Sequence, residues 1–350
     1  MLEETKKKPW FLLLVCLCFC LYSSVAWRGK PLEPAVICSG QSDTPSLVPV
    51  GQTVGIKLFS HGVMVVALSQ VETEKGSCSP AQACGLRVGD IITEIAKEPV
   101  NTIDEVAAVV QGSGGAEMDI TALRGGHKMS LTTEAVCLAD GSYKLGAWVR
   151  DSMAGIGTVT WYDPESGRFA ALGHGITDVD TKLLMPLKSG GLMHSSVSGI
   201  IKGSAGHPGQ LHGTFDLSSD LGHLTANTDC GVFGTATQGA FSGKPLPVAA
   251  RREIHTGPAT IRSNIEGTTV QEYDVEILRI YPESMSASQN LMIQITDPDL
   301  LEATGGVVQG MSGSPILQDG KLVGAVTHVL VNDPTRGYGI LVENMLEAAQ

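Results

Sequence analysis

The sequence predicts a mainly β protein, with a small sheet domain followed by a larger region of two β-barrels, behind an apolar N-terminal segment. Three observations support this class. Glycine is frequent, with 42 among 350 residues, whereas only 17% of the residues are charged and 43% are hydrophobic. Short apolar segments of strand character recur from about residue 50 onward, separated by Gly, Asn, Asp and Ser. Such spacing is typical of sandwiches and barrels, and a chain of this length can form two or three domains.

The first 30 residues have the pattern of a membrane-targeting segment. Lysines at positions 6 to 8 precede an uncharged stretch from Trp10 to Trp27. This stretch is near the lower length limit for crossing a bilayer, and the lysines favour export of the remainder of the chain. Residues 1–30 are therefore predicted to form a cytoplasmic tail and a transmembrane signal-anchor. A cleavable signal peptide is the alternative, because Ser24-Val25-Ala26 carries small residues where a signal peptidase reads them.

Residues 31–50 are predicted to form an exposed tether. Pro, Ser, Gly and Asp are frequent here and no periodicity is sustained, which is typical of a loop. The alternative is a first strand at Leu47-Val48-Pro49-Val50 that packs on the domain after it.

Residues 51–133 resemble a PDZ domain. The resemblance depends on an apolar strand from Val63 to Ala67, on the run Ala83-Cys84-Gly85-Leu86-Arg87-Val88-Gly89-Asp90, and on a helical pattern from Ile103 to Val110. A PDZ domain adds an extended peptide to a sheet edge and surrounds its terminal carboxylate with backbone N–H groups. The alternative is a PDZ fold that has lost its ligand and only packs on the next domain. The predicted peptide-binding residues are Val54, Gly55 and Ile56.

Residues 134–350 form a series of short β segments between turns, which predicts a pair of β-barrels. Alternation is clear from Val270 to Ile277, and a terminal helix is expected from Leu341 to Ala349. The stretch from Gly190 to Gly222 is rich in glycine and histidine and has no interpretable pattern. Two interpretations of this stretch remain open, a loop that shapes a cleft and a solvated linker.

The motif Gly310-Met311-Ser312-Gly313-Ser314-Pro315, before the apolar pair Ile316-Leu317, has the pattern of the nucleophile turn of a chymotrypsin-like serine protease. Glycines on both sides of Ser312 allow a tight bend that exposes its hydroxyl. The same bend aims the N–H groups of Gly310 and Ser312 at one point, where they would stabilise the oxyanion of an acyl-transfer intermediate. The alternative is an ordinary Gly/Ser turn between two strands.

A serine nucleophile needs a base, and His174 is the best candidate among nine histidines. It follows a short apolar strand, Phe169-Ala170-Ala171-Leu172, and glycines flank it, so the strand end would present it to a cleft. The other histidines lie mostly in Gly/Ser-rich loops. His207 and His212 have no cysteine or carboxylate at ligand spacing, so neither a metal site nor a cofactor is expected.

Several motifs, taken in order, resemble the stage IV sporulation protein B peptidase family of endospore-forming bacteria. They are the run from Trp148 to Thr158, Ala171-Leu172-Gly173-His174, the motif around Ser312, and the runs from Gly324 to Val329 and from Val331 to Thr335. The match extends over nearly the whole chain. The resemblance implies a serine endopeptidase with Ser312 as nucleophile and His174 as general base.

The resemblance places the acidic member of the catalytic triad at Asp297, 15 residues before Ser312. The order His, Asp, Ser is that of chymotrypsin. However, the aspartate of ordinary chymotrypsin-like enzymes lies nearer the midpoint between the other two residues. The alternative for this segment is a turn or a helix cap, because Asp before Pro starts turns and Asp299 could cap a short helix from Leu300 to Ala303, so both roles remain open. Asp178 and Asp180 are the alternative residues for orienting His174.

The charge and the cysteine content argue against a nucleic-acid-binding protein and against a disulfide-stabilised fold. The net charge of −12, with no basic stripe, argues against a nucleic-acid partner and leaves proteins and peptides. Outside the predicted anchor the cysteine number is odd and the spacing irregular, which does not fit a disulfide framework. Free thiols are expected, and a small loop closed by Cys78 and Cys84 is the alternative. These cysteines are Cys38, Cys78, Cys84, Cys137 and Cys230.

The resemblance also implies a cellular role. The chain would be anchored by a single span in the forespore membrane, with its catalytic domain in the intermembrane space. There it would cleave a membrane-associated regulator and trigger sigma-factor processing in the mother cell. Self-cleavage between about Arg28 and Val50, under PDZ control, is expected because an unfolded segment is accessible to a protease.

Two other functions are considered. A general exported quality-control protease also joins PDZ and protease domains, but its PDZ domain follows the protease. A PDZ tether with an inactive protease body should have lost His174 or Ser312, and this chain has both.

Overall fold

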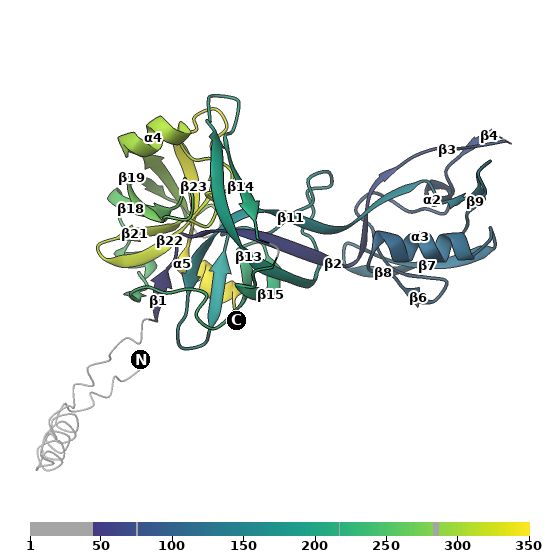
Figure 1. Cartoon of the computed structure of the whole chain (residues 1–350), viewed down its shortest axis with the longest axis horizontal. Helices are drawn as coiled ribbons and strands as arrows, with labels where there is room; N and C mark the ends of the chain where they lie inside the picture. Colours follow the sequence, from purple (N-terminus) through teal and green to yellow (C-terminus); the bar gives the residue numbers. More distant parts are fainter. Residues whose placement is uncertain (1–44, 75, 217, 283–286) are drawn as a thin grey trace, which may run out of the picture. The chain divides into compact units, whose positions relative to one another are not determined.

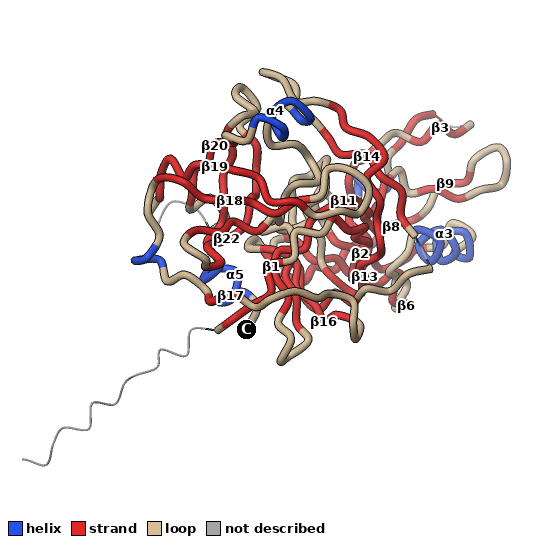
Figure 2. Tube along the Cα trace, turned by 60° about the vertical axis from the view of Figure 1, so that its left-hand side comes forward, coloured by secondary structure: helices blue, strands red, loops and turns tan. Residues whose placement is uncertain are grey.

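The structure is a computed structural model that describes residues 45–74, 76–216, 218–282 and 287–350. The described residues belong to one compact unit. The mainly β class is confirmed, because strands dominate and the helices are short (Figures 1 and 2). The predicted anchor and most of the predicted tether lie outside the described residues. Within the described part of the chain, no helix is long and apolar enough to span a membrane.

Six strands form the first barrel, in the order β11-β12-β16-β15-β13-β2. The ring closes because β11 also pairs with β2. Buried apolar side chains fill it, among them Leu58, Phe169 and Val232. The strands are β2 (Thr53–Leu68), β11 (Ala147–Tyr162), β12 (Arg168–Ala171), β13 (Leu187–Ile201), β15 (Gly222–Thr228) and β16 (Gly231–Ala236).

The end of the predicted tether is a strand. β1 (Ser46–Pro49) pairs with β11 and with β17 (Leu246–Pro247). Leu47 and Val48 are buried. The tether prediction is therefore wrong for these residues, because the apolar pair is packed into the molecule.

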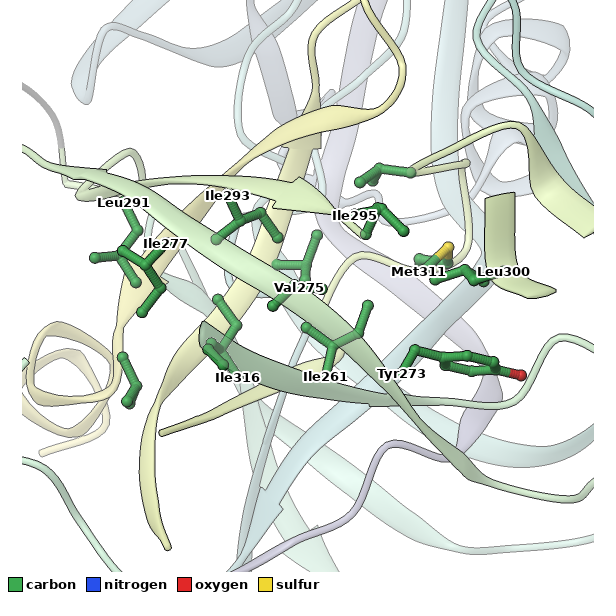
Figure 3. Close-up of a cluster of buried hydrophobic side chains, with 14 of the residues drawn as sticks. Ile261, Tyr273, Val275, Ile277, Leu291, Ile293, Ile295, Leu300, Met311 and Ile316 are labelled. Carbon is green, nitrogen blue, oxygen red and sulfur yellow. The ribbon is translucent and has the colours of Figure 1, made fainter. Parts of the chain in front are cut away.

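The second barrel is a closed ring of six strands, in the order β18-β19-β20-β23-β22-β21. Figure 3 shows its core, in which Ile261, Val275, Ile277, Ile293 and Ile316 pack together. The alternation predicted around residues 270–277 is confirmed by β19, and the terminal helix by α5 (Val342–Ala348). The strands are β18 (Gly257–Ser263), β19 (Gln271–Ile280), β20 (Leu291–Ile295), β21 (Pro315–Gln318), β22 (Lys321–Val329) and β23 (Arg336–Leu341). A short 3-10 helix spans Arg251–Glu253, and α4 spans Pro298–Thr304.

The PDZ domain continues the sheet of β2 through β5, β7 and β8. Its helix α3 (Ile103–Gly112) confirms the predicted helix. Thr102 is the N-cap residue and forms a capping box with Glu105. Asp90 is buried and paired with Arg124. The remaining elements are β3 (Val71–Thr73), β4 (Gly76–Cys78), α2 (Pro80–Ala83), β5 (Ile91–Ile95), β6 (Glu98–Pro99), β7 (Glu117–Arg124), β8 (His127–Glu134), β9 (Val136–Cys137) and β10 (Tyr143–Lys144).

The predicted peptide-binding residues Val54, Gly55 and Ile56 do not form a PDZ groove. They pair with β11 on one side and with β13 on the other, so neither edge is free to accept a peptide. A Cβ on Gly55 would come within 2.5 Å of the Phe215 ring. The prediction is wrong because β2 is one long strand, whose first half lies in the barrel and whose second half pairs with β5 of the PDZ domain (Figure 1).

The region from Gly190 to Gly222 is also structured. It contains most of β13 and all of β14 (Gln210–Phe215), which pair as an antiparallel ladder. A Cβ on Gly190 would come within 2.6 Å of the Lys57 carbonyl oxygen. The small residues that hide a strand pattern in the sequence thus permit close approach of neighbouring strands.

Candidate active site

A cavity of about 540 Å³ is lined by residues of both barrels, including His174 and Ser312. His174 follows the end of β12 in the first barrel, and Ser312 precedes β21 in the second. The structure therefore brings the two predicted catalytic residues into one cavity. Gly310 lines the same cavity.

The nucleophile turn has the backbone that its glycines predict. Gly310 and Gly313 have φ angles of 102° and 99°, which an L side chain rarely adopts. The carbonyl oxygens of Gly310 and Ser312 accept hydrogen bonds from the hydroxyl and the N–H of Thr158, at 2.8 and 3.0 Å. Among the described residues, the N–H groups of Gly310 and Ser312 have no acceptor. Both N–H groups are therefore available to a substrate carbonyl oxygen.

The two serines of the motif differ in environment. Ser312 is partly buried and lines the cavity, where its Oγ donates a hydrogen bond to the Thr327 carbonyl oxygen at 2.7 Å. Ser314 is fully buried, and within the described residues its Oγ has no hydrogen-bond partner. Only Ser312 is placed to meet a substrate.

His174 follows two residues in the left-handed conformation, Leu172 and Gly173, each with φ 69°. Its Nδ1 lies 2.9 Å from the Gly175 carbonyl oxygen. A carbonyl only accepts, so Nδ1 carries the proton and Nε2 is left to act as a base. Burial lowers the pKa of His174 below 6.5, although the hydrogen bond to Gly175 acts in the opposite direction.

Thr158, on β11, joins the two halves of the site. Its N–H and hydroxyl hold the nucleophile turn, and its own carbonyl oxygen accepts from the N–H of Leu172 at 3.1 Å. The side chain is fully buried. The one sequence signal for this role is that Thr158 ends the glycine-rich run from Trp148.

His328, on β22, is a second histidine in the cavity. Its ring centroid lies 4.9 Å from that of His174. Burial, and to a smaller extent the nearby His174, lower the pKa of His328 to about 4, so it is neutral at pH 7. No sequence pattern assigns His328 a role, and its position on β22, next to Thr327, places it close to the nucleophile turn.

Asp297 lies at the N-cap of α4. Its carboxylate accepts hydrogen bonds from the N–H of Leu300 at 2.9 Å and, more weakly, from that of Asp274 at 3.4 Å. Among the described residues, no hydrogen bond or ion pair joins Asp297 to His174, whose Nδ1 is already bonded to Gly175. The structure thus shows the helix-capping role for Asp297 and not the orienting one.

The alternative orienting residues, Asp178 and Asp180, lie in the loop after His174 and pair with Arg150. In the described part of the chain, neither carboxylate bonds to the His174 ring.

The four described cysteines, Cys78, Cys84, Cys137 and Cys230, are free thiols, so no disulfide closes the loop between Cys78 and Cys84. The described residues contain no group of three or more metal-ligating side chains.

Comparison with known families gives two matches. The family described as SpoIVB peptidase S55 matches residues 141–346, and the PDZ domain family matches residues 77–124. A search of curated proteins found no match.

Solved structures give weaker similarities. The active form of the Rv3671c protease from M. tuberculosis aligns with a TM-score of 0.31 and 15% identity, over 57% of this chain and 73% of that chain. An inactive mutant form of the same protein, from M. tuberculosis H37Rv, aligns with a TM-score of 0.29 and 14% identity, over 56% of this chain and 79% of that one.

Proposed function

This chain is a serine peptidase that belongs to the SpoIVB peptidase S55 family, and we propose that it is an endopeptidase acting through Ser312 and His174. The observation that carries the proposal is the cavity shared by these two residues and Gly310. Ser312 Oγ attacks the substrate carbonyl carbon while Nε2 of His174 removes its proton. The N–H groups of Gly310 and Ser312 then bind the oxyanion. Because the Ser312 hydroxyl donates to Thr327, it must first rotate towards His174.

The cavity wall favours apolar substrate side chains. Its lining includes Ile56, Ile156, Leu172, Val308 and Val329, and none of the described residues that line it is Asp, Glu, Lys or Arg. A charged side chain would lose its hydration there without gaining an opposite charge. We expect a peptide library to show cleavage beside apolar residues and poor cleavage beside Lys, Arg, Asp or Glu.

For its biological role, we propose the sporulation pathway that the family resemblance implies. The chain would be held in the forespore membrane and would cleave a membrane-associated regulator in the intermembrane space. The family membership and the PDZ domain support this role. A general exported quality-control protease is the competing function.

Two experiments test the proposal. The full chain should be labelled by a fluorophosphonate probe, and Ser312→Ala should not, because the probe reacts only with an activated serine. Absence of labelling in folded wild-type protein would argue for an inactive protease body. A spore-forming host that lacks its own family member would then be given wild type or Ser312→Ala. If wild type restores sigma-factor processing and Ser312→Ala does not, the sporulation role is supported. If the two strains differ only in general protein turnover, the quality-control function is supported.

A further inference from the structure

Arg150 lies on β11 at the point where this strand leaves the PDZ sheet. The preceding residue, Val149, pairs with Val65 of β2 and packs on the PDZ core. The guanidinium of Arg150 reaches the loop that follows His174, where it donates to the carboxylate of Asp178 and, at 2.8 Å, to that of Asp180. A side chain from the PDZ edge therefore contacts the catalytic histidine loop.

Asp178 is the centre of that loop. Its carboxylate is 0% exposed and accepts hydrogen bonds from the N–H groups of Asp180 and Thr181, at 3.0 and 2.7 Å. Burial alone would raise the pKa of Asp178, but Thr181, Asp180 and the charge of Arg150 together lower it, so the carboxylate is ionised. Its neighbours Thr177 and Val179 line the catalytic cavity.

The geometry points to Arg150 as a positioning residue for the general base: its ion pair with Asp178 fixes the loop from Gly175 to Met185, and through it the His174 ring. The inference rests on the proposed role of His174 as base. Gly175, whose carbonyl sets the His174 tautomer, is the first residue of this loop. Asn227 holds the loop at Ile176 and Met185, and backbone hydrogen bonds join Asp178 to Leu183 and Lys182 within it. Arg150 adds the contact that ties the segment around Asp178 to β11. Arg150 does not line the cavity and acts only through these neighbours.

The first test compares Arg150→Met with a matched control. Loss of the ion pair lets the loop shift, and we expect kcat to fall about 10- to 100-fold with KM changed less than about threefold. Arg124→Met is the control, because Arg124 and Asp90 form an ion pair of nearly equal burial in the PDZ domain, with 27% and 1% exposure against 28% and 0% for Arg150 and Asp178. The control should lose similar thermal stability and keep kcat within about threefold. An equal fall in kcat for both variants would overturn the inference.

A second variant separates positioning from stability. Arg150→Met with Asp178→Asn removes both charges and keeps an acceptor for the N–H groups of Asp180 and Thr181, so stability should largely return. We expect activity to stay low, since the link to β11 is still absent. Recovery of both stability and activity would show that the ion pair is only structural.

A third readout does not need activity. In Ser312→Ala protein, the NMR signals of the His174 ring should move in Arg150→Met and remain in place in Arg124→Met. Unchanged His174 signals would refute the role of Arg150 even if the peptidase proposal failed. Absence of fluorophosphonate labelling in wild type would refute the catalytic proposal, whereas the His174 signals would still show whether Arg150 positions the ring.

Discussion

At the residue scale, the catalytic proposal depends on two side chains that share one cavity. Ser312→Ala and His174→Ala should each reduce kcat by about 10⁴-fold or more, because the two residues form one proton-transfer unit. The double variant should be little worse than either single one. Peptide hydrolysis and circular dichroism of the three variants measure these effects.

Ser314→Ala is the control for that pair. Its hydroxyl is buried and lies outside the cavity, so activity should remain close to wild type. An inactive Ser314→Ala beside an active Ser312→Ala would show that the nucleophile had been assigned to the wrong serine.

The pH dependence of the reaction follows from burial of His174. The neutral ring is the active base, and the lowered pKa keeps it neutral to more acidic pH. We therefore expect the acidic limb of kcat/KM to have its midpoint below 6.5, measured with a substrate that does not titrate in this range. A midpoint above 6.5 would mean that an anion near the ring stabilises its charged form, as an orienting aspartate would.

Asp297 provides a direct test of capping against catalysis. Asp297→Ala should lower the free energy of unfolding by about 1 kcal/mol, because α4 loses its N-cap. Asp297→Asn should have a smaller effect, since Asn also caps helices, and both variants should keep near-normal turnover. If Asp297→Asn instead lost about 100-fold or more in kcat with unchanged stability, the orienting role would be restored.

At the element scale, the nucleophile turn is held against β11 by close backbone contact. A Cβ on Gly313 would lie 2.0 Å from the Thr158 carbonyl oxygen and 2.6 Å from the Leu172 nitrogen. Gly313→Ala should therefore lower the free energy of unfolding by about 3 kcal/mol or more, displace the turn and abolish activity. Denaturant unfolding and probe labelling measure both effects.

Gly320→Ala is the matched control for the turn. Gly320 also has a positive φ, 74°, but a Cβ there would meet nothing within 4 Å. Gly320→Ala should lower the free energy of unfolding by only about 1 kcal/mol, from backbone strain, and leave activity intact. Equal losses in the two variants would mean that strain, and not contact with β11, explains the effect at Gly313.

At the scale of the whole molecule, β11 connects the functions of the chain. Its first residues complete the PDZ sheet, Met153 to Ile156 line the cavity, and Thr158 holds the nucleophile turn. β2 likewise runs from the first barrel into the PDZ domain. The PDZ and peptidase domains therefore share the strands β2 and β11, in addition to being consecutive in the chain.

The proposed self-cleavage belongs to this scale. β1 is paired on both sides and its apolar residues are buried, so its peptide bonds are poor substrates. New N-termini should lie between residue 28 and the start of β1, and mass spectrometry should find them in wild type but not in Ser312→Ala. Cleavage that persists in Ser312→Ala would assign the processing to another peptidase.

The sequence by itself determined the β class, the helices at 103–110 and near the C-terminus, the family, and the two residues that share the cavity. These features depend on local chemistry, because a nucleophile turn needs its glycines and a barrel strand needs alternation. Both signals can be read within about ten residues.

Only the tertiary structure decided which strands pair. It placed Val54 to Ile56 inside the barrel instead of at a PDZ edge and showed Asp297 as the N-cap of α4. It also brought His328, Thr158 and Arg150 to the site. Except for the Asp297 cap, whose partner Leu300 is three residues away, each of these outcomes depends on partners that are distant in the sequence. A glycine-rich strand such as β13 has no local pattern that specifies its partner, because close backbone approach and not side-chain alternation determines its pairing.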